Sequence, residues 1–158
     1  MSIKNILGRV LPTGTSNTNL APAAEGTEQL FSTLASTLPV FLQWEWDEQH
    51  NGILAILEID AADAALAVLG DCFGDSWDRG NIRKAPQLVN RAPRDFGGLH
   101  TNQKIFARGV TEDIILLGLW WPWGHGGTVS IRLLPYGPDA TEPDVSATRV
   151  AIQKAFTQ

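Results

Sequence analysis

Residues Ile114–Tyr136 read IILLGLWWPWGHGGTVSIRLLPY, the longest apolar stretch in the chain, and include three of its six tryptophans. Positions 114–121 are apolar at odd and even places alike, which is typical of a strand buried on both faces. Positions 129–133 alternate apolar and polar residues, as a half-solvated strand does. The glycines between the two segments favour a turn. We therefore predict a hairpin whose first strand ends at Pro122, since proline has no N–H to donate to a neighbouring strand.

A second hairpin is predicted nearer the N-terminus. From Val40 onward apolar and polar residues alternate, which places Trp44 and Trp46 together on the apolar side of a strand. The dipeptide Asn51-Gly52 favours a tight turn, and the alternation resumes behind it. These patterns predict two antiparallel strands joined by a short turn.

Helices are predicted before, between and after these hairpins. The first spans Thr27 to Leu38 with Thr27 as its cap, and the second begins at Asp60 and stops at Gly70. A last helix is capped by Asp144 or Ser146, and residues 101–108 form a further strand. The predicted order is α-β-β-α-β-β-β-α, an α+β fold with an antiparallel sheet of about five strands and helices packed on it. This order is similar to that of roadblock-type and profilin-like domains, but element order alone implies no function.

The predicted organisation is one α+β domain over residues 27–158, preceded by an arm and linker at 1–26. A long, irregular, basic excursion is expected at 70–100, where glycine and proline are frequent. In the arm, one helical face would carry Ile3, Ile6, Leu7, Val10 and Leu11. Such a segment packs on its own domain, or attaches to a membrane surface or a partner helix.

Composition narrows the class of protein. The chain has 158 residues, of which 44% are hydrophobic and 18% charged, as in a soluble globular domain. No apolar segment reaches the roughly 18 residues of a membrane span. Cys72 is the single cysteine, and the first residues lack the features of a secretory signal, so a cytoplasmic location without disulfides is expected. The net charge of −5 disfavours nucleic-acid binding.

The charge is unevenly distributed along the chain. Residues 79–100 carry +4, which leaves −9 for the remainder. We expect the basic segment to pack against the acidic side of the first hairpin, where Glu45 and Asp47 share one face.

Catalytic signals in the sequence are weak. The run Gly74-Asp75-Ser76-Trp77 is similar to the start of a GDS-type esterase block, but such an enzyme also needs an Asp-x-x-His pair. At that spacing His125 is preceded by Pro122, so an ordinary turn is favoured. The three histidines lack the spacing of a zinc site, and neither a metal nor a cofactor is predicted. The alternative hypothesis is a small hydrolase or ligand-binding enzyme with a pocket under residues 79–100. Its candidate residues are Ser76, His100, His125, Asp78 and Asp95.

The tryptophans of the C-terminal hairpin carry the leading hypothesis. If the strand alternates, Trp120, Trp121 and Trp123 cannot all face inward, and exposed tryptophan is enriched at interface hot spots. We therefore predict a non-enzymatic protein-binding domain, of the small acidic adaptor, secretion-chaperone or immunity-protein class, whose partner is another protein or a second copy. The expected contact residues are Trp120, Trp121, Trp123 and His125, with Arg79, Arg83 and Arg94. A third hypothesis, an aromatic platform for carbohydrate or single-stranded nucleic acid, requires coplanar exposed rings along a groove.

Overall fold

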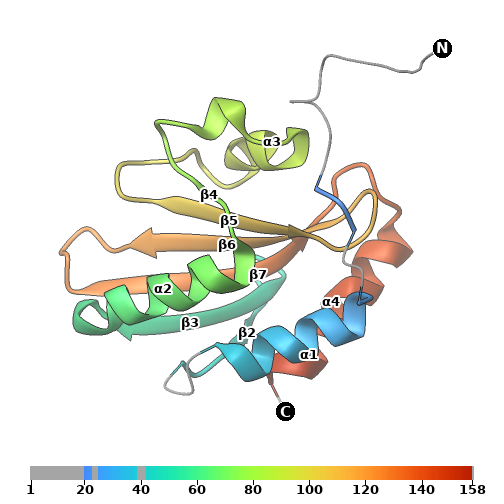
Figure 1. Ribbon diagram of the computed structural model, residues 1–158, viewed down its shortest axis with the longest axis horizontal. Coiled ribbons are helices and arrows are strands. Elements are labelled where there is room, and N and C mark those ends of the chain that lie inside the picture. Colours follow the sequence, from blue (N-terminus) through green and yellow to red (C-terminus); the bar gives the residue numbers. More distant parts are fainter. Residues whose placement is uncertain (1–19, 23–24, 39–41, 158) are drawn as a thin grey trace.

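The computed structural model describes residues 20–22, 25–38 and 42–157, and within them six strands form one antiparallel sheet. The strands are β2 (Glu45–Asp47), β3 (Gly52–Glu58), β4 (Ser76–Trp77), β5 (Lys104–Gly109), β6 (Ile115–Pro122) and β7 (Thr128–Tyr136). Their order across the sheet is β2-β3-β7-β6-β5-β4, which places the two hairpins side by side (Figure 1). The predicted α+β class is confirmed, with six strands where about five were expected.

Both predicted hairpins are present. In β6 every residue from Ile115 to Trp120 is buried, as the apolar run indicates, and the strand ends at Pro122. The first hairpin turns over residues 48–51, where Asn51 has a positive φ of 55°, whereas Gly52, predicted in the turn, already pairs with Asp47 at the start of β3. The start predicted for its first strand, at Val40, lies outside the described residues, and within them the strand begins only at Glu45.

Helices cover the two faces of the sheet unequally. The first face is covered by α1 (Thr27–Thr37), α2 (Ala62–Phe73) and α4 (Glu142–Phe156), whose apolar residues join those of β3, β6 and β7 in one core. The second face is covered by α3 (Gln87–Asp95), which packs over β4, β5 and β6. Figure 1 shows α3 at the β4 edge of the sheet and α1 beside α4 near the β2 edge.

Four helix boundaries differ from the sequence prediction. The first helix has Gly26 at its N-cap position, so Thr27 is its first residue and not its cap. The second helix does not stop at Gly70 but continues to Phe73, because Phe73 extends its buried face, and it ends at Gly74, where φ is +82°. It is preceded by a 3₁₀ turn, η2 (Ile59–Ala61), so Asp60 is not its cap. The last helix is capped by the Thr141 side chain, which accepts a hydrogen bond from the Asp144 backbone N–H.

Only part of the predicted excursion at 70–100 is irregular. It contains β4, a 3₁₀ turn η3 (Ile82–Lys84) and α3. Pro86 lies at the N-cap position of α3, where its missing N–H removes no hydrogen bond within the helix. The apolar residues of α3, Leu88, Val89 and Ala92, are buried against the sheet.

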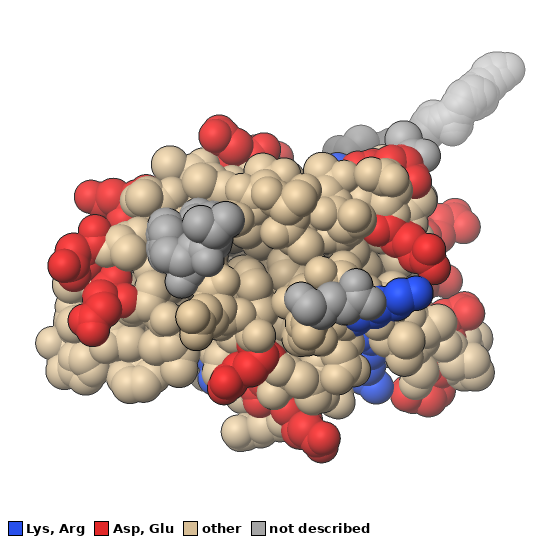
Figure 2. All heavy atoms as spheres, turned by 90° about the horizontal axis from the view of Figure 1, so that it is seen from below, with Lys and Arg blue, Asp and Glu red and all other residues tan. Residues whose placement is uncertain are grey.

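The acidic character of the chain is visible on its surface. Figure 2 shows carboxylate side chains spread around the face seen from below, and basic side chains at few places on it. Within the described part of the chain, no helix is both long and apolar enough to cross a membrane.

Candidate functional site

The three clustered tryptophans occupy three different environments. Trp120 pairs with Ile131 and is 3% exposed in the core of the first face. Trp121 pairs with Ser130, so its ring lies on the second face, where it is partly buried. Trp123 lies beyond the strand and is 44% exposed. The prediction that at least one ring reaches the surface is confirmed, and that ring is Trp123.

Trp123 borders a groove of about 920 Å³ at the tip of the β6–β7 hairpin, which we call the tip groove. One wall comes from η2 and the start of α2, with Ile59 and Leu66. Further lining residues come from the chain after β4 and from the first residue of β5, with Asp78, Arg79 and Lys104. The groove therefore combines apolar side chains with charges of both signs, since Asp63 of α2 also lines it.

Backbone hydrogen bonds fix the positions of Ile59 and Trp123 beside the groove. The backbone N–H of Trp123 donates to the Thr128 carbonyl at 2.8 Å, and that of Ile59 donates to the Gly127 carbonyl at 3.0 Å. The second bond ties η2 to the hairpin tip, so Ile59 and Trp123 are positioned relative to one another. Ile59, which is 48% exposed, received no role in the sequence analysis, because an apolar residue at a strand end carries no distinguishing signal.

His125 supports the tip instead of lining the groove. Its Nδ1 accepts a hydrogen bond from the Gly127 backbone N–H at 2.9 Å, and its ring lies edge-on to Trp123 with centroids 5.7 Å apart. In the neutral ring this bond leaves the proton on Nε2. The rings of Trp123 and His125 make an angle of 79°, so these two rings do not form the coplanar platform that the third hypothesis needs.

The structure separates the three predicted arginines. Arg79 lines the tip groove, where its Nη1 donates to Thr101 Oγ1 at 2.7 Å. Arg83 in η3 and Arg94 in α3 are exposed and do not line the groove. The basic segment makes its ion pair through Arg91 to Asp139 at 2.9 Å, not with the acidic side of the first hairpin. The prediction that the basic segment packs against the acidic side of the first hairpin is therefore wrong, since Arg132 of β7 makes the ion pair with Asp47.

The candidate catalytic residues do not converge. Asp78 and His100 line the tip groove, but Asp78 Oδ1 accepts from the Gly80 N–H and His100 Nε2 contacts the Gly97 carbonyl. Ser76 lies on β4, and among the described residues no hydrogen bond joins its Oγ to a histidine. The described residues also contain no group of side chains suited to hold a metal. The nucleophile and base required by the hydrolase hypothesis are therefore not in contact.

Asp95 has a partner away from the tip groove. Its Oδ2 accepts a 2.5 Å hydrogen bond from the Tyr136 hydroxyl in a second cleft of about 630 Å³. Burial and this hydrogen bond to a carboxylate raise the pKa of Tyr136 above its ordinary value. Tyr136 is therefore a persistent donor that anchors the end of α3 to β7.

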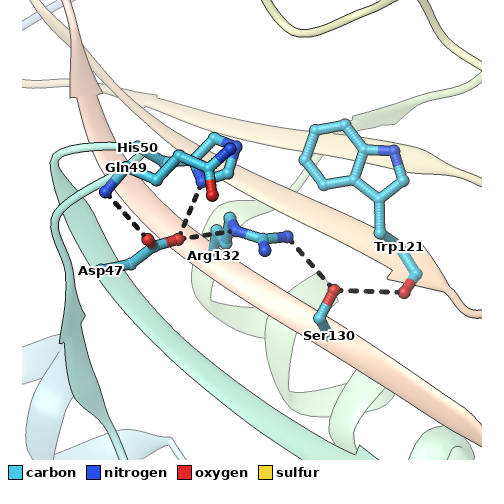
Figure 3. A network of polar contacts seen from close by, with 6 residues as sticks. All are labelled: Asp47, Gln49, His50, Trp121, Ser130 and Arg132. Carbon is cyan, nitrogen blue, oxygen red and sulfur yellow. Dashed lines mark hydrogen bonds and ion pairs between the residues drawn. The ribbon is translucent and has the colours of Figure 1, made fainter.

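A polar network on the second face was not found from the sequence. Asp47 Oδ2 accepts from Arg132 Nε at 2.9 Å and contacts His50 Nδ1 at 2.9 Å (Figure 3). Arg132 Nη1 also contacts Ser130 Oγ at 3.3 Å, and that hydroxyl donates to the Trp121 carbonyl. The alternation of polar residues in β2 and β7 is the only sign of this network in the sequence. The pairing of Asp47 with Arg132 is not visible there, because the two residues are 85 positions apart.

Asp47→Asn is expected to lower the free energy of unfolding at pH 7 by about 1.5–3 kcal/mol, the typical worth of hydrogen bonds to a charged group. Burial raises the pKa of Asp47, but the hydrogen bonds from Arg132 and His50 outweigh it, so the folded pKa lies below 3.8. A lowered folded pKa gives stability that is present above 3.8 and is lost as pH falls through the folded value.

Urea unfolding of both proteins at pH 7 and near pH 3 measures this difference, which should shrink in acid. Asp139→Asn is the matched control, since Asp139 makes an ion pair but its side chain is 64% exposed, and should cost under about 1 kcal/mol. A difference that grows in acid contradicts the assignment.

Comparison of the chain with protein-family models found no match, and comparisons with curated proteins and with solved structures found none either.

Proposed function

We propose that this protein is a non-enzymatic protein-binding domain whose contact surface is the tip groove. The observation that carries the proposal is the pairing of exposed Trp123 with exposed Ile59 along one groove. Among the described residues four large apolar side chains are exposed, and these two gather at one site. A tryptophan beside an aliphatic residue in a preformed groove has the composition and rigidity of an interface hot spot.

The groove supports protein recognition better than the two alternatives. A hydrolase needs a nucleophile held by a base. Asp78 and His100 are instead hydrogen-bonded to the nearby backbone groups of Gly80 and Gly97. An aromatic platform needs several rings in one plane, whereas Trp120 is buried and Trp121 lies on the opposite sheet face. The proposal keeps the acidic adaptor, secretion-chaperone and immunity-protein classes, each of which binds a protein client.

The proposal is tested with the double variant Ile59→Ser, Trp123→Ala in the full chain. Loss of two hot-spot side chains should cost about 2 kcal/mol or more of binding free energy, which corresponds to at least roughly 30-fold weaker capture. Quantitative affinity capture from the native cell, with sedimentation of the purified protein to detect self-association, measures the change. Both variant residues are about half exposed and lie outside the core, so the free energy of unfolding should change by less than about 1 kcal/mol.

Val150→Ser is the matched control, because Val150 is 63% exposed on α4 and does not line the groove. Val150→Ser should capture the same partners as the wild type, in the same amounts. Equal recovery of all partners with the double variant, or equal loss with the control, would show that the tip groove is not the contact surface.

A further inference from the structure

Half of the second sheet face has none of the described helices over it. On this face α3 and the residues around it cover β4, β5, most of β6 and the end of β7. The remaining area, over the end of β6 and over β7, β3 and β2, exposes Ile56 at 52%, with Leu54 and Trp121 partly exposed. The register places these three side chains on the same face, with Ile56 opposite Ser130 and Ser130 opposite Trp121. We call the area around Leu54, Ile56 and Trp121 the open strip.

The open strip has apolar side chains on β3 and β6, with Ser130 and Arg132 of β7 between them, and it is acidic at its border. Glu45 pairs with Leu54, and Glu58 follows Ile56 by two residues, so both exposed carboxylates share the face. Arg132 also lies there, but its ion pair with Asp47 neutralises it (Figure 3). From Ile56 on β3 to Trp121 on β6 the strip spans two strand spacings, about 10 Å, which is the diameter of one helix. Its chemistry suits a segment with an apolar stripe and basic neighbours.

The N-terminal part of the chain enters on this same face. Leu20 packs against the apolar cluster of the second face. Ala21 crosses Gly109 so closely that a Cβ at Gly109 would overlap the backbone of Ala21. The register puts Gly109 beside Ile115, at the opposite end of β6 from Trp121. Whatever precedes Leu20 in the chain therefore starts beside the second face.

The sequence before Leu20 has the chemistry that the open strip calls for. Its apolar residues recur at helical spacing and are accompanied by Lys4 and Arg9. The connection from Leu11 to Leu20 spans up to about 30 Å when extended. The strand from Ile115 to Trp121 covers about 20 Å along the sheet. The tether is therefore long enough to carry residues 3–11 to the strip.

We propose that residues 3–11 dock on the open strip of their own chain, with the apolar stripe over Ile56 and Trp121 and the basic residues toward Glu45 and Glu58. This occupant is favoured over a separate partner because the tether holds it near the strip at a high effective concentration. Docking removes an exposed apolar patch next to an open sheet face, and leaves the tip groove free for the proposed partner.

Disulfide trapping in the full chain tests the docking. In a Cys72→Ser background, the pair Leu7→Cys, Ile56→Cys is compared with the pair Leu7→Cys, Val150→Cys in a glutathione redox buffer. Positions 56 and 150 are both exposed, at 52% and 63%, so the two introduced thiols have similar access to solvent. The intrachain disulfide of the first pair should form with an effective concentration at least roughly tenfold higher than that of the second. Adding Lys4→Glu and Arg9→Glu should reduce the difference.

Equal effective concentrations for the two pairs would overturn the proposal. So would a disulfide between positions 7 and 56 found only between chains, which assigns the strip to a second copy. Binding to vesicles with anionic lipid, together with loss of the preference for position 56, would assign the segment to a membrane surface.

A single-cysteine measurement guards against variants that disturb the fold. The thiol introduced by Ile56→Cys in the Cys72→Ser background should be alkylated several-fold faster when Ile6→Asp and Leu7→Asp are added. The thiol introduced by Val150→Cys in the same background should react at an unchanged rate. An unchanged rate at position 56 would also overturn the docking.

Discussion

Trp120→Ala is expected to lower the free energy of unfolding by about 3–5 kcal/mol, the usual cost of truncating a large core aromatic. Trp120 is 3% exposed and belongs to the apolar core of the first face, together with Ile131 opposite it. Removing its indole leaves a cavity in the core of the first face, which close packing does not refill. Denaturant unfolding followed by far-ultraviolet circular dichroism measures the loss.

Trp123→Ala is the matched comparison on the same hairpin. At 44% exposure its ring makes fewer contacts, and its removal should cost less than about 1 kcal/mol of stability while weakening partner capture. Similar losses of stability from both substitutions would mean that the hairpin does not alternate as described. The comparison separates a tryptophan that builds the fold from one that is presented to a partner.

Gly52→Ala is expected to lower the free energy of unfolding by about 1–3 kcal/mol or more. A Cβ at Gly52 would lie 2.5 Å from the Leu133 carbonyl oxygen and 2.6 Å from Leu134 Cβ. Neither group can move freely, because Leu133 pairs with Ile53 in the β3–β7 ladder. Thermal or urea unfolding measures the effect.

Gly124→Ala provides the control for the loss of a glycine as such. Gly124 lies in the other hairpin turn, where a Cβ would have no heavy atom within 4 Å. It should change stability by less than about 0.5 kcal/mol. If the two alanine variants unfold alike, the close approach of β3 to β7 at Gly52 is not a constraint on the fold.

The sequence predicts both hairpins but only some of the residues that line the groove. The alternation of a strand predicts that at least one of Trp120, Trp121 and Trp123 is exposed, and that argument needs no partner strand, but it does not single out Trp123. Ile59 was missed because it becomes important through a hydrogen bond to Gly127, which is distant in sequence. Arg83 and Arg94 were grouped with Arg79 by sequence proximity, but η3 and α3 carry them away from the groove wall.

The sequence by itself determined the two hairpins, the burial of β6 on both faces and the surface position of one tryptophan. These follow from the period of apolar residues and from turn chemistry, which act over a few residues. Only the tertiary structure decided that Arg132 neutralises Asp47, that Trp120 is core while Trp123 is surface, and that none of the described helices covers half of the second face. Those outcomes depend on β3 pairing with β7 and on where α3 packs, and such long-range contacts leave no periodic trace in the sequence.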